Sequence, residues 1–478
     1  MASKKTLNAK NLEALGAERL AELLIEISTG NAAAKRRLRL RLAGAQSPGE
    51  VAKEVRKRLT TIARSRSFVD WQNRRALVED LETQRRAIID QVAKADPAEA
   101  LDLMWRFLAL ANPVFGRCDD SSGTVIGIFH AACGDLGKIA KAEKADPETL
   151  ADRAFGALNE NDYGQCDDLI EVLTPALGQV GLEHLKQLVV QLSQEPLPKS
   201  DPEDRQVIAW GSGGPIYADD HAGRRRDSMV RLALQEIADA QGDADAFIAQ
   251  QSERARTVPK VAAEIAQRLL AAGRAEEAWT AINAVDEDRP GWIPFEWEQA
   301  RVDVLEALGR TDEAQEFRLA CFSRSLSDAH LRAYLKRLPD FDDIEAEERA
   351  LSHALGYPSV HHALMFLVSW PALDRAAHLV LTRADELDGD HYEILAPAAD
   401  ALEAKHPLAA TLLRRALIDF SLEKNRVKRY RHAARHLQEC ASLAAAIENF
   451  GTFETHDTYA ARLRNEHGRK SSFWSLVS

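Results

Sequence analysis

The chain has 478 residues, a formal net charge of −12, 45% hydrophobic residues and only 6% aromatic residues. No run approaches the roughly 18 consecutive apolar residues that a membrane span needs, and the five cysteines form no CxxC or CxC pair. These features exclude a disulfide-stapled scaffold and predict a protein of the cytoplasm, with reduced thiols and no membrane contact.

The first 66 residues are basic within an otherwise acidic chain, with about 15 Lys or Arg against about 6 Asp or Glu. Residues 50–64 have an apolar residue every three to four positions, which predicts an amphipathic helix. Its cations either contact the phosphates of a nucleic acid or form a solvated surface that pairs with the acidic body. The candidate nucleic-acid-binding residues here are Lys53, Arg56, Lys57 and Arg64. A longer helix is predicted over residues 68–93, with Trp71 facing inward.

A similar stretch then occurs twice, about 50 residues apart. Both copies open with Lys-Ala-Asp-Pro, at residues 94–97 and 144–147, and both end with Gly-x-Cys-Asp-Asp, at residues 116–120 and 164–168. Aspartate followed by proline is typical of the start of a helix. We expect the paired aspartates to cap a second helix, because a thiol beside carboxylates at one turn is not a recognised zinc spacing. The sequence therefore predicts two helical hairpins of a repeat, and no metal site.

Residues 194–227 interrupt the helical rhythm with several prolines and the run Gly-Ser-Gly-Gly-Pro. A glycine-rich loop beside arginines is able to hold an anion. However, no strand precedes this loop and no Gly-Lys-Ser/Thr follows it, so the phosphate-binding P-loop is missing. We predict an irregular loop between two helical regions that serves as an interaction element. Its candidate residues are Gly211, Gly213, Gly214, Tyr217, Asp219, Asp220, His221, Arg224, Arg225 and Arg226.

Two later stretches look like turns of tetratricopeptide-type hairpins. Residues 271–278, AAGRAEEA, recur as residues 307–314, ALGRTDEA. The spacing of about 36 residues is close to the roughly 34-residue period of such repeats.

Near the C-terminus a second group of cations surrounds a tyrosine: Arg426, Lys428, Arg429, Tyr430, Arg431, Arg464 and Lys470. Tyr430 would stack on a base if this group binds single-stranded nucleic acid. The alternative is that Tyr430 anchors a core and the cations form an exposed stripe.

Four motifs carry a family resemblance: residues 307–310 (ALGR), 331–336 (LRAYLK), 425–434 (NRVKRYRHAA) and 459–464 (YAARLR). With them, the chain from about Glu296 onward resembles the helical region downstream of the zinc finger in bacterial SWIM-type zinc-finger proteins. The section up to Cys118 resembles an uncharacterised bacterial family of that architecture. The resemblance implies binding of protein or nucleic acid. The CxC…CxH zinc ligands are absent from this sequence, so it implies no zinc site.

Together these patterns predict an all-α fold, an α-solenoid of tetratricopeptide- or HEAT-like helical hairpins. We expect an N-terminal helical region over residues 1–193, the irregular segment 194–227, and a tetratricopeptide-like region over residues 228–478. The predicted function is a non-enzymatic cytoplasmic scaffold that binds a protein partner. The alternative is a nucleic-acid-binding protein that uses the two basic groups. An enzyme ranks third, because only the glycine-rich segment supports one, and we expect no cofactor.

Overall fold

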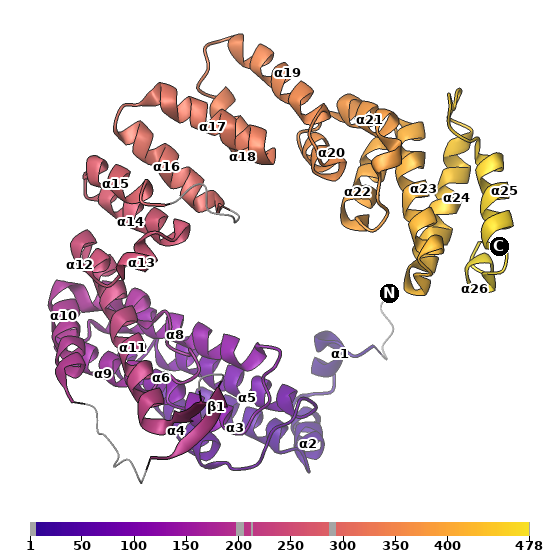
Figure 1. Ribbon diagram of the computed structural model, residues 1–478. Coiled ribbons are helices and arrows are strands. Elements are labelled where there is room, and N and C mark those ends of the chain that lie inside the picture. Colours follow the sequence, from indigo (N-terminus) through magenta and orange to yellow (C-terminus); the bar gives the residue numbers. More distant parts are fainter. Residues whose placement is uncertain (1–5, 197–204, 212–213, 286–292, 478) are drawn as a thin grey trace. The chain divides into compact units, whose positions relative to one another are not determined.

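The computed structural model describes residues 6–196, 205–211, 214–285 and 293–477. The chain divides into two compact units, Met1–Thr257 and Val258–Ser478 (Figure 1). In both units most helices pack against helices that are near neighbours along the chain. Packing between successive hairpins is the defining property of an α-solenoid. The predicted all-α solenoid of helical hairpins is therefore confirmed.

The first unit contains thirteen numbered α-helices, one π-helical segment and one β-hairpin within its described residues. The helices are α1 Ala9–Glu13, α2 Ala17–Ser28, α3 Ala32–Gln46, α4 Pro48–Arg64, α5 Arg74–Ala87, the π-helical segment η1 Ile88–Val92, α6 Pro97–Leu108, α7 Ala111–Phe115, α8 Thr124–Glu143, α9 Pro147–Asn159, α10 Leu169–Gln194, α11 Ala218–Gln241, α12 Ala244–Ala249 and α13 Glu253–Arg256. The strands are β1 Val207–Gly211 and β2 Gly214–Tyr217.

The repeated stretch forms two helical hairpins, as predicted. Asp96 accepts a hydrogen bond from the Glu99 amide at the start of α6, and Asp146 accepts one from the Thr149 amide at the start of α9. Asp120 caps the helix after the first turn, accepting from the amides of the first residues of α8. Helix α6 packs on α8, α9 packs on α10, and α8 packs on α10, so the two hairpins share one core.

Two features of this unit differ from the sequence prediction. The helix expected over residues 68–93 begins at Arg74 instead, and Trp71 lies in the preceding turn with 67% of its surface exposed. The chain before it is held extended by a bridge in which the Val69 amide donates to the Arg117 carbonyl at 2.8 Å. Pairing with a distant turn therefore replaces the helical conformation that the local pattern favours.

Residues 194–227 are not an irregular loop throughout. They include the two strands, and residues from Ala218 onward already belong to α11. This segment also does not divide the units, because α11 packs along α10 within one core. The boundary lies farther on, between Thr257 and Val258.

The second unit consists of helices throughout its described residues. They are α14 Pro259–Ala271, α15 Ala275–Ile282, α16 Phe295–Ala307, α17 Thr311–Ser325, α18 Asp328–Leu335, α19 Asp342–Leu355, α20 Val360–Ser369, α21 Leu373–Thr382, the 3₁₀ segment η2 Ala384–Glu386, α22 Tyr392–Leu402, α23 Pro407–Glu423, the 3₁₀ segment η3 Val427–Arg429, α24 Tyr430–Ala444, α25 His456–His467 and α26 Ser471–Trp474.

The two predicted tetratricopeptide-like turns have the same construction. Gly273 and Gly309 adopt left-handed φ angles of +74° and +72°, which glycine reaches without strain. The arginine after each glycine forms a two-pronged ion pair with the glutamate three residues later. The Nε–Oε1 distance is 2.7 Å for Arg274–Glu277 and 2.6 Å for Arg310–Glu313.

None of the helices in the described part of the chain combines the length and apolar character that a membrane crossing requires.

Candidate interaction site

A β-hairpin presents apolar side chains to solvent in the first unit. Strand β1 pairs antiparallel with β2, and a bulge at Ile208 interrupts the register. All five residues of β1 are exposed, including Val207 at 43%, Ile208 at 46% and Trp210 at 78%. Gly211 and Gly214 lie at the turn, where Gly214 has φ +113°, and the predicted Gly213 lies outside the described residues. This hairpin is the only sheet in the described part of the chain.

The base of the hairpin is fixed by a cluster of polar contacts. The Arg205 guanidinium donates to both oxygens of Asp219, with Nε–Oδ2 at 2.9 Å, and forms an ion pair with Asp220 at 2.7 Å. It also lies over the Tyr217 ring, 4.0 Å from the ring centroid. The hydrogen bonds from Arg205 lower the pKa of Asp219, which keeps this carboxyl ionised. The cluster joins the segment before β1 to the start of α11.

The arginines that follow bind neighbouring helices instead of the glycine turn. Arg225 donates to the Asn159 carbonyl at 2.8 Å and pairs with Asp162 at 2.5 Å, while Arg226 donates to the Glu195 carbonyl at 2.7 Å. His221 and Arg224 are exposed on α11. The anion-holding arrangement of glycines and arginines is therefore not formed, because Arg225 and Arg226 already have partners.

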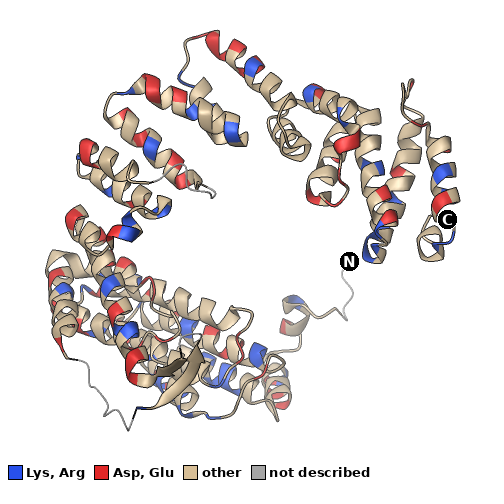
Figure 2. Cartoon of the chain, in the orientation of Figure 1, with Lys and Arg blue, Asp and Glu red and all other residues tan. Residues whose placement is uncertain are grey.

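The N-terminal basic residues are partly neutralised. Lys53 pairs with Glu50 at 2.7 Å, and Arg56 pairs with Glu99 at 2.5 Å, whereas Lys57 and Arg64 lie on the exposed side of α4. In Figure 2 the positions of acidic residues alternate with those of basic residues along the helices. Interleaved charges weaken the attraction to phosphates that an unbroken basic face would provide.

In the C-terminal basic group the structure agrees with the alternative in which Tyr430 anchors a core. Tyr430 is only 4% exposed and packs edge-on against Phe473, so it anchors a core and presents no ring to a base. The cations around it are mostly engaged as well. Arg429 pairs with Asp390 at 3.0 Å, and Lys470 donates a hydrogen bond to Asn425. Arg464 and Arg426 lie over the rings of Trp474 and Phe420. Lys428 and Arg431 are exposed. Base stacking by Tyr430 is wrong because the ring completes the hydrophobic cluster at this end of the chain.

A pocket of about 740 Å³ adjoins the turn before α10 and is lined by Cys166, Asp167, Asp168, Arg225 and Glu236, among others. Burial raises the pKa of the Cys166 thiol to about 12, so this cysteine is an unreactive thiol. Burial, with the charges of Asp167 and Asp168, raises the pKa of Glu236 to about 7. Asp168 occupies the predicted N-cap position of α10, although its side chain makes no capping hydrogen bond.

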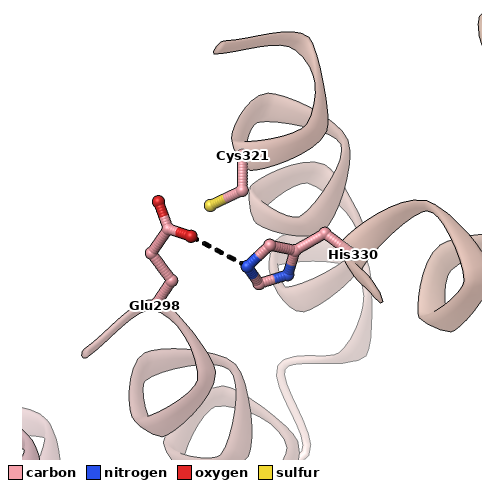
Figure 3. Close-up of side chains that lie close together, drawn as sticks. All are labelled: Glu298, Cys321 and His330. Atoms are coloured by element: carbon pink, nitrogen blue, oxygen red, sulfur yellow. Dashed lines mark hydrogen bonds and ion pairs between the residues drawn. The ribbon is translucent and has the colours of Figure 1, made fainter. Parts of the chain in front are cut away.

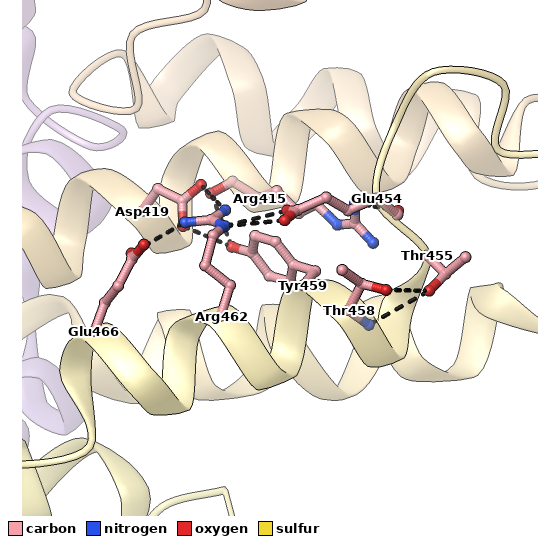
Figure 4. A network of polar contacts seen from close by, with 8 residues as sticks. All are labelled: Arg415, Asp419, Glu454, Thr455, Thr458, Tyr459, Arg462 and Glu466. Carbon is pink, nitrogen blue, oxygen red and sulfur yellow. Dashed lines mark hydrogen bonds and ion pairs between the residues drawn. The ribbon is translucent and has the colours of Figure 1, made fainter.

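A second pocket, of about 670 Å³, lies against α23 and α25. Beside it the Tyr459 hydroxyl donates to Asp419 at 2.9 Å, and Arg462 contacts Asp419, Glu454 and Glu466 (Figure 4). The guanidinium of Arg415 lies over the Tyr459 ring, and its Nε and Nη2 atoms are shielded from solvent. Burial raises the pKa of Asp419, against the effects of Tyr459 and Arg462. Because its hydrogen bonds and ion pairs join Tyr459 and Arg462 of α25 to Asp419 of α23, this network packs α25 on α23.

A family of unknown function, DUF6880, matches residues 2–476. The chain belongs to this family. The match agrees with the expected uncharacterised family, whereas the SWIM-type resemblance stays a prediction.

No curated protein matches this DUF6880 chain. Among solved structures it is similar to one described as a circular tandem repeat protein with novel repeat topology and enhanced subunit contact surfaces. The identity is 15% and the TM-score 0.15, with 95% of this chain and 91% of that chain covered.

Two groups in this DUF6880 chain are absent from the sequence prediction. The exposed strand β1 lies in the segment predicted as a loop, although its Val-Ile-Ala-Trp run is typical of a strand. The other group is Glu298, Cys321 and His330, from three different helices of the second unit (Figure 3). Their spacing matches no recognised zinc motif, so only the packing of the helices reveals them.

Proposed function

We propose that this chain is a non-enzymatic helical-repeat scaffold that binds a protein partner through its β-hairpin. The observation that carries the proposal is Trp210, which is 78% exposed on a strand whose residues all face solvent. Tryptophan is enriched among the few interface residues that supply most of the binding free energy. An apolar strand left open to solvent is also a hazard that soluble proteins usually avoid. A partner that covers it removes this hazard.

The anchoring of the hairpin supports the same function. The bonds from Arg205 to Asp219 and Asp220 hold the hairpin base against α11. A preorganised element loses less conformational entropy on binding than a flexible loop. We infer that the partner offers an apolar groove or pocket that accepts the Trp210 ring. The proposal places the protein in the cytoplasm, which its five unpaired cysteines support.

The test is quantitative capture of partners from cells that produce the full-length protein. We expect Trp210→Ala to weaken binding of the main partner by about 2 kcal/mol, or roughly thirtyfold, because it removes the anchor side chain. Trp71→Ala is the matched control, since Trp71 is similarly exposed in the same unit, and it should bind as the unaltered chain does. Equal binding by all three proteins would contradict the proposal.

Fluorescence anisotropy with labelled single-stranded DNA, duplex DNA and RNA tests the nucleic-acid alternative. If the chain binds a protein through its hairpin, we expect no nucleic-acid binding that depends on Lys57 and Arg64, the exposed cations of α4. Binding that falls steeply with salt and drops in the double variant Lys57→Ala, Arg64→Ala would favour a nucleic-acid partner instead.

A further inference from the structure

Three metal-ligating side chains lie together in the second unit. Glu298 projects from α16, Cys321 from α17 and His330 from α18 (Figure 3). One carboxylate oxygen, one sulfur and one imidazole nitrogen lie within 4.8 Å of one another, and all three residues are buried. The side chain of Glu298 is only 8% exposed, and that of His330 only 2%.

The contacts inside this cluster centre on the carboxylate. Oε2 of Glu298 lies 2.9 Å from Nε2 of His330, and Arg324 donates to Oε1 of the same carboxylate. Nη2 of Arg324 also lies 3.7 Å from Sγ of Cys321. Ionisable groups are seldom buried without a partner, because desolvation of their charged forms is costly. Here thiol and imidazole both converge on one buried carboxylate.

We propose that Glu298, Cys321 and His330 bind one zinc ion. Thiolate, imidazole and carboxylate are the ligands that zinc takes in proteins. A thiolate and a carboxylate together carry two negative charges, which a divalent ion balances inside a buried site. Zinc–ligand bonds of about 2.0 to 2.3 Å place tetrahedral ligand atoms about 3.3 to 3.7 Å apart. Small side-chain movements therefore close the cluster around an ion.

Arg324 is the group that competes with the ion. Its guanidinium pairs with Glu298, yet half of its side chain is exposed, so it can turn into solvent when a metal replaces it. A water molecule would then complete four ligands. The ion would join the tetratricopeptide-like hairpin α16–α17 to α18, the next helix in the chain. Because only the folded chain brings these ligands together, zinc should also stabilise the folded state.

The test uses the full-length protein, reduced and freed of metal with a chelator, and titrated with Co²⁺. We expect a thiolate-to-cobalt charge-transfer band that saturates at one equivalent and disappears when Zn²⁺ is added. The band should be absent in Cys321→Ser and unchanged in Cys440→Ser. Cys440 is the matched control because it is equally buried, and its thiol donates to the Thr411 carbonyl. No band, or a band that survives in Cys321→Ser, would overturn the proposal.

Arg324→Ala provides an independent test that leaves all three ligands in place. Removing the competing cation should tighten cobalt binding about two- to fivefold, the range expected for loss of a half-exposed ion pair. Affinity that is unchanged or weaker in this variant would count against the site, whether or not Cys321→Ser folds. Arg332→Ala serves as the control, since its ion pair is with Asp328 and does not involve the cluster.

Discussion

At the scale of single residues, two buried arginines of the second unit, Arg414 and Arg318, lie where several acceptors surround them. Arg414 is 1% exposed, and its guanidinium contacts Asp400 at 3.0 Å, Glu403 at 2.7 Å and Glu439 at 2.9 Å. Arg318, 2% exposed, bonds Gln315 and Glu306. A buried cation adds stability only when its hydrogen bonds are satisfied, because its desolvation is costly. These arginines fix how neighbouring helices align.

Replacing Arg414 tests this role. We expect Arg414→Ala to lower the local free energy of unfolding of α23 and α24 by about 2 to 3 kcal/mol, through lost ion pairs and lost packing of the alkyl stem. Native-state hydrogen exchange is the suitable measurement, because a chain of two units need not unfold in one step. Arg435→Ala is the control. Its exposed side chain also pairs with Glu439, at 3.3 Å, and should contribute less than about 0.5 kcal/mol.

Glu236 makes the stability of the first unit depend on pH. Its pKa is about 7 in the folded chain, against about 4.3 for an exposed glutamate, so the folded state binds the proton more tightly. This proton stabilises the fold at low pH, and the stability falls as the pH rises from about 4.3 to about 7. Glu236→Gln removes the titrating group. Its unfolding temperature should exceed that of the unaltered chain above pH 7, by an amount equivalent to about 1 kcal/mol after screening.

The same thermal scans across this pH range should show no such change for Glu183→Gln. Glu183 is exposed and lies farther along the neighbouring helix α10. If Glu236→Gln and Glu183→Gln have the same effect on the unfolding temperature, the carboxyl of Glu236 does not titrate in the pocket.

At the scale of elements, one close helix crossing depends on a missing side chain. A Cβ atom on Gly137 in α8 would lie 2.2 Å from the carbonyl oxygen of Val172 in α10. The backbone of α10 at Val172 cannot move aside for an added Cβ atom as the end of a flexible side chain can. Glycine at this position therefore sets how closely the two repeated hairpins approach.

Gly137→Ala should force α8 and α10 apart and destabilise the first unit by about 1 to 3 kcal/mol, the usual range for overpacking. Thermal unfolding followed by circular dichroism measures the change. Gly134→Ala, on the same helix, meets no atom within 4 Å and should be neutral or raise the unfolding temperature, because alanine favours helix over glycine. Equal losses in both variants would mean that the crossing is not the cause.

Elements set by local patterns are predictable from the sequence, and those set by distant contacts are not. Asp96-Pro97 and Asp146-Pro147 begin helices as expected, because caps act within one turn. The prediction for Trp71 is wrong because a bridge between Val69 and Cys118 holds that stretch extended. The β-hairpin is not predicted because its stability depends on the contact between Arg205 and Asp219, and hydrophobic periodicity contains no information on that contact.

At the scale of the whole molecule, the fold class follows from composition, helix periodicity and repeats, but the division into units does not. Glycine and proline mark residues 194–227 as a boundary, whereas α10 and α11 pack together across that segment and the first unit ends at Thr257. The Glu298, Cys321 and His330 cluster is hidden for a related reason. Its ligands come from three helices, so only tertiary packing brings them together.

The matched turns at Gly273 and Gly309 bear on how chains of this kind change in length. Each turn holds its own glycine and its own arginine–glutamate pair, so the same local contacts recur in both hairpins. In a solenoid each hairpin contacts mainly its neighbours. A gene segment that encodes one such hairpin can therefore be duplicated or lost as a whole. A chain of this architecture thus changes in length by whole hairpins and not by single helices.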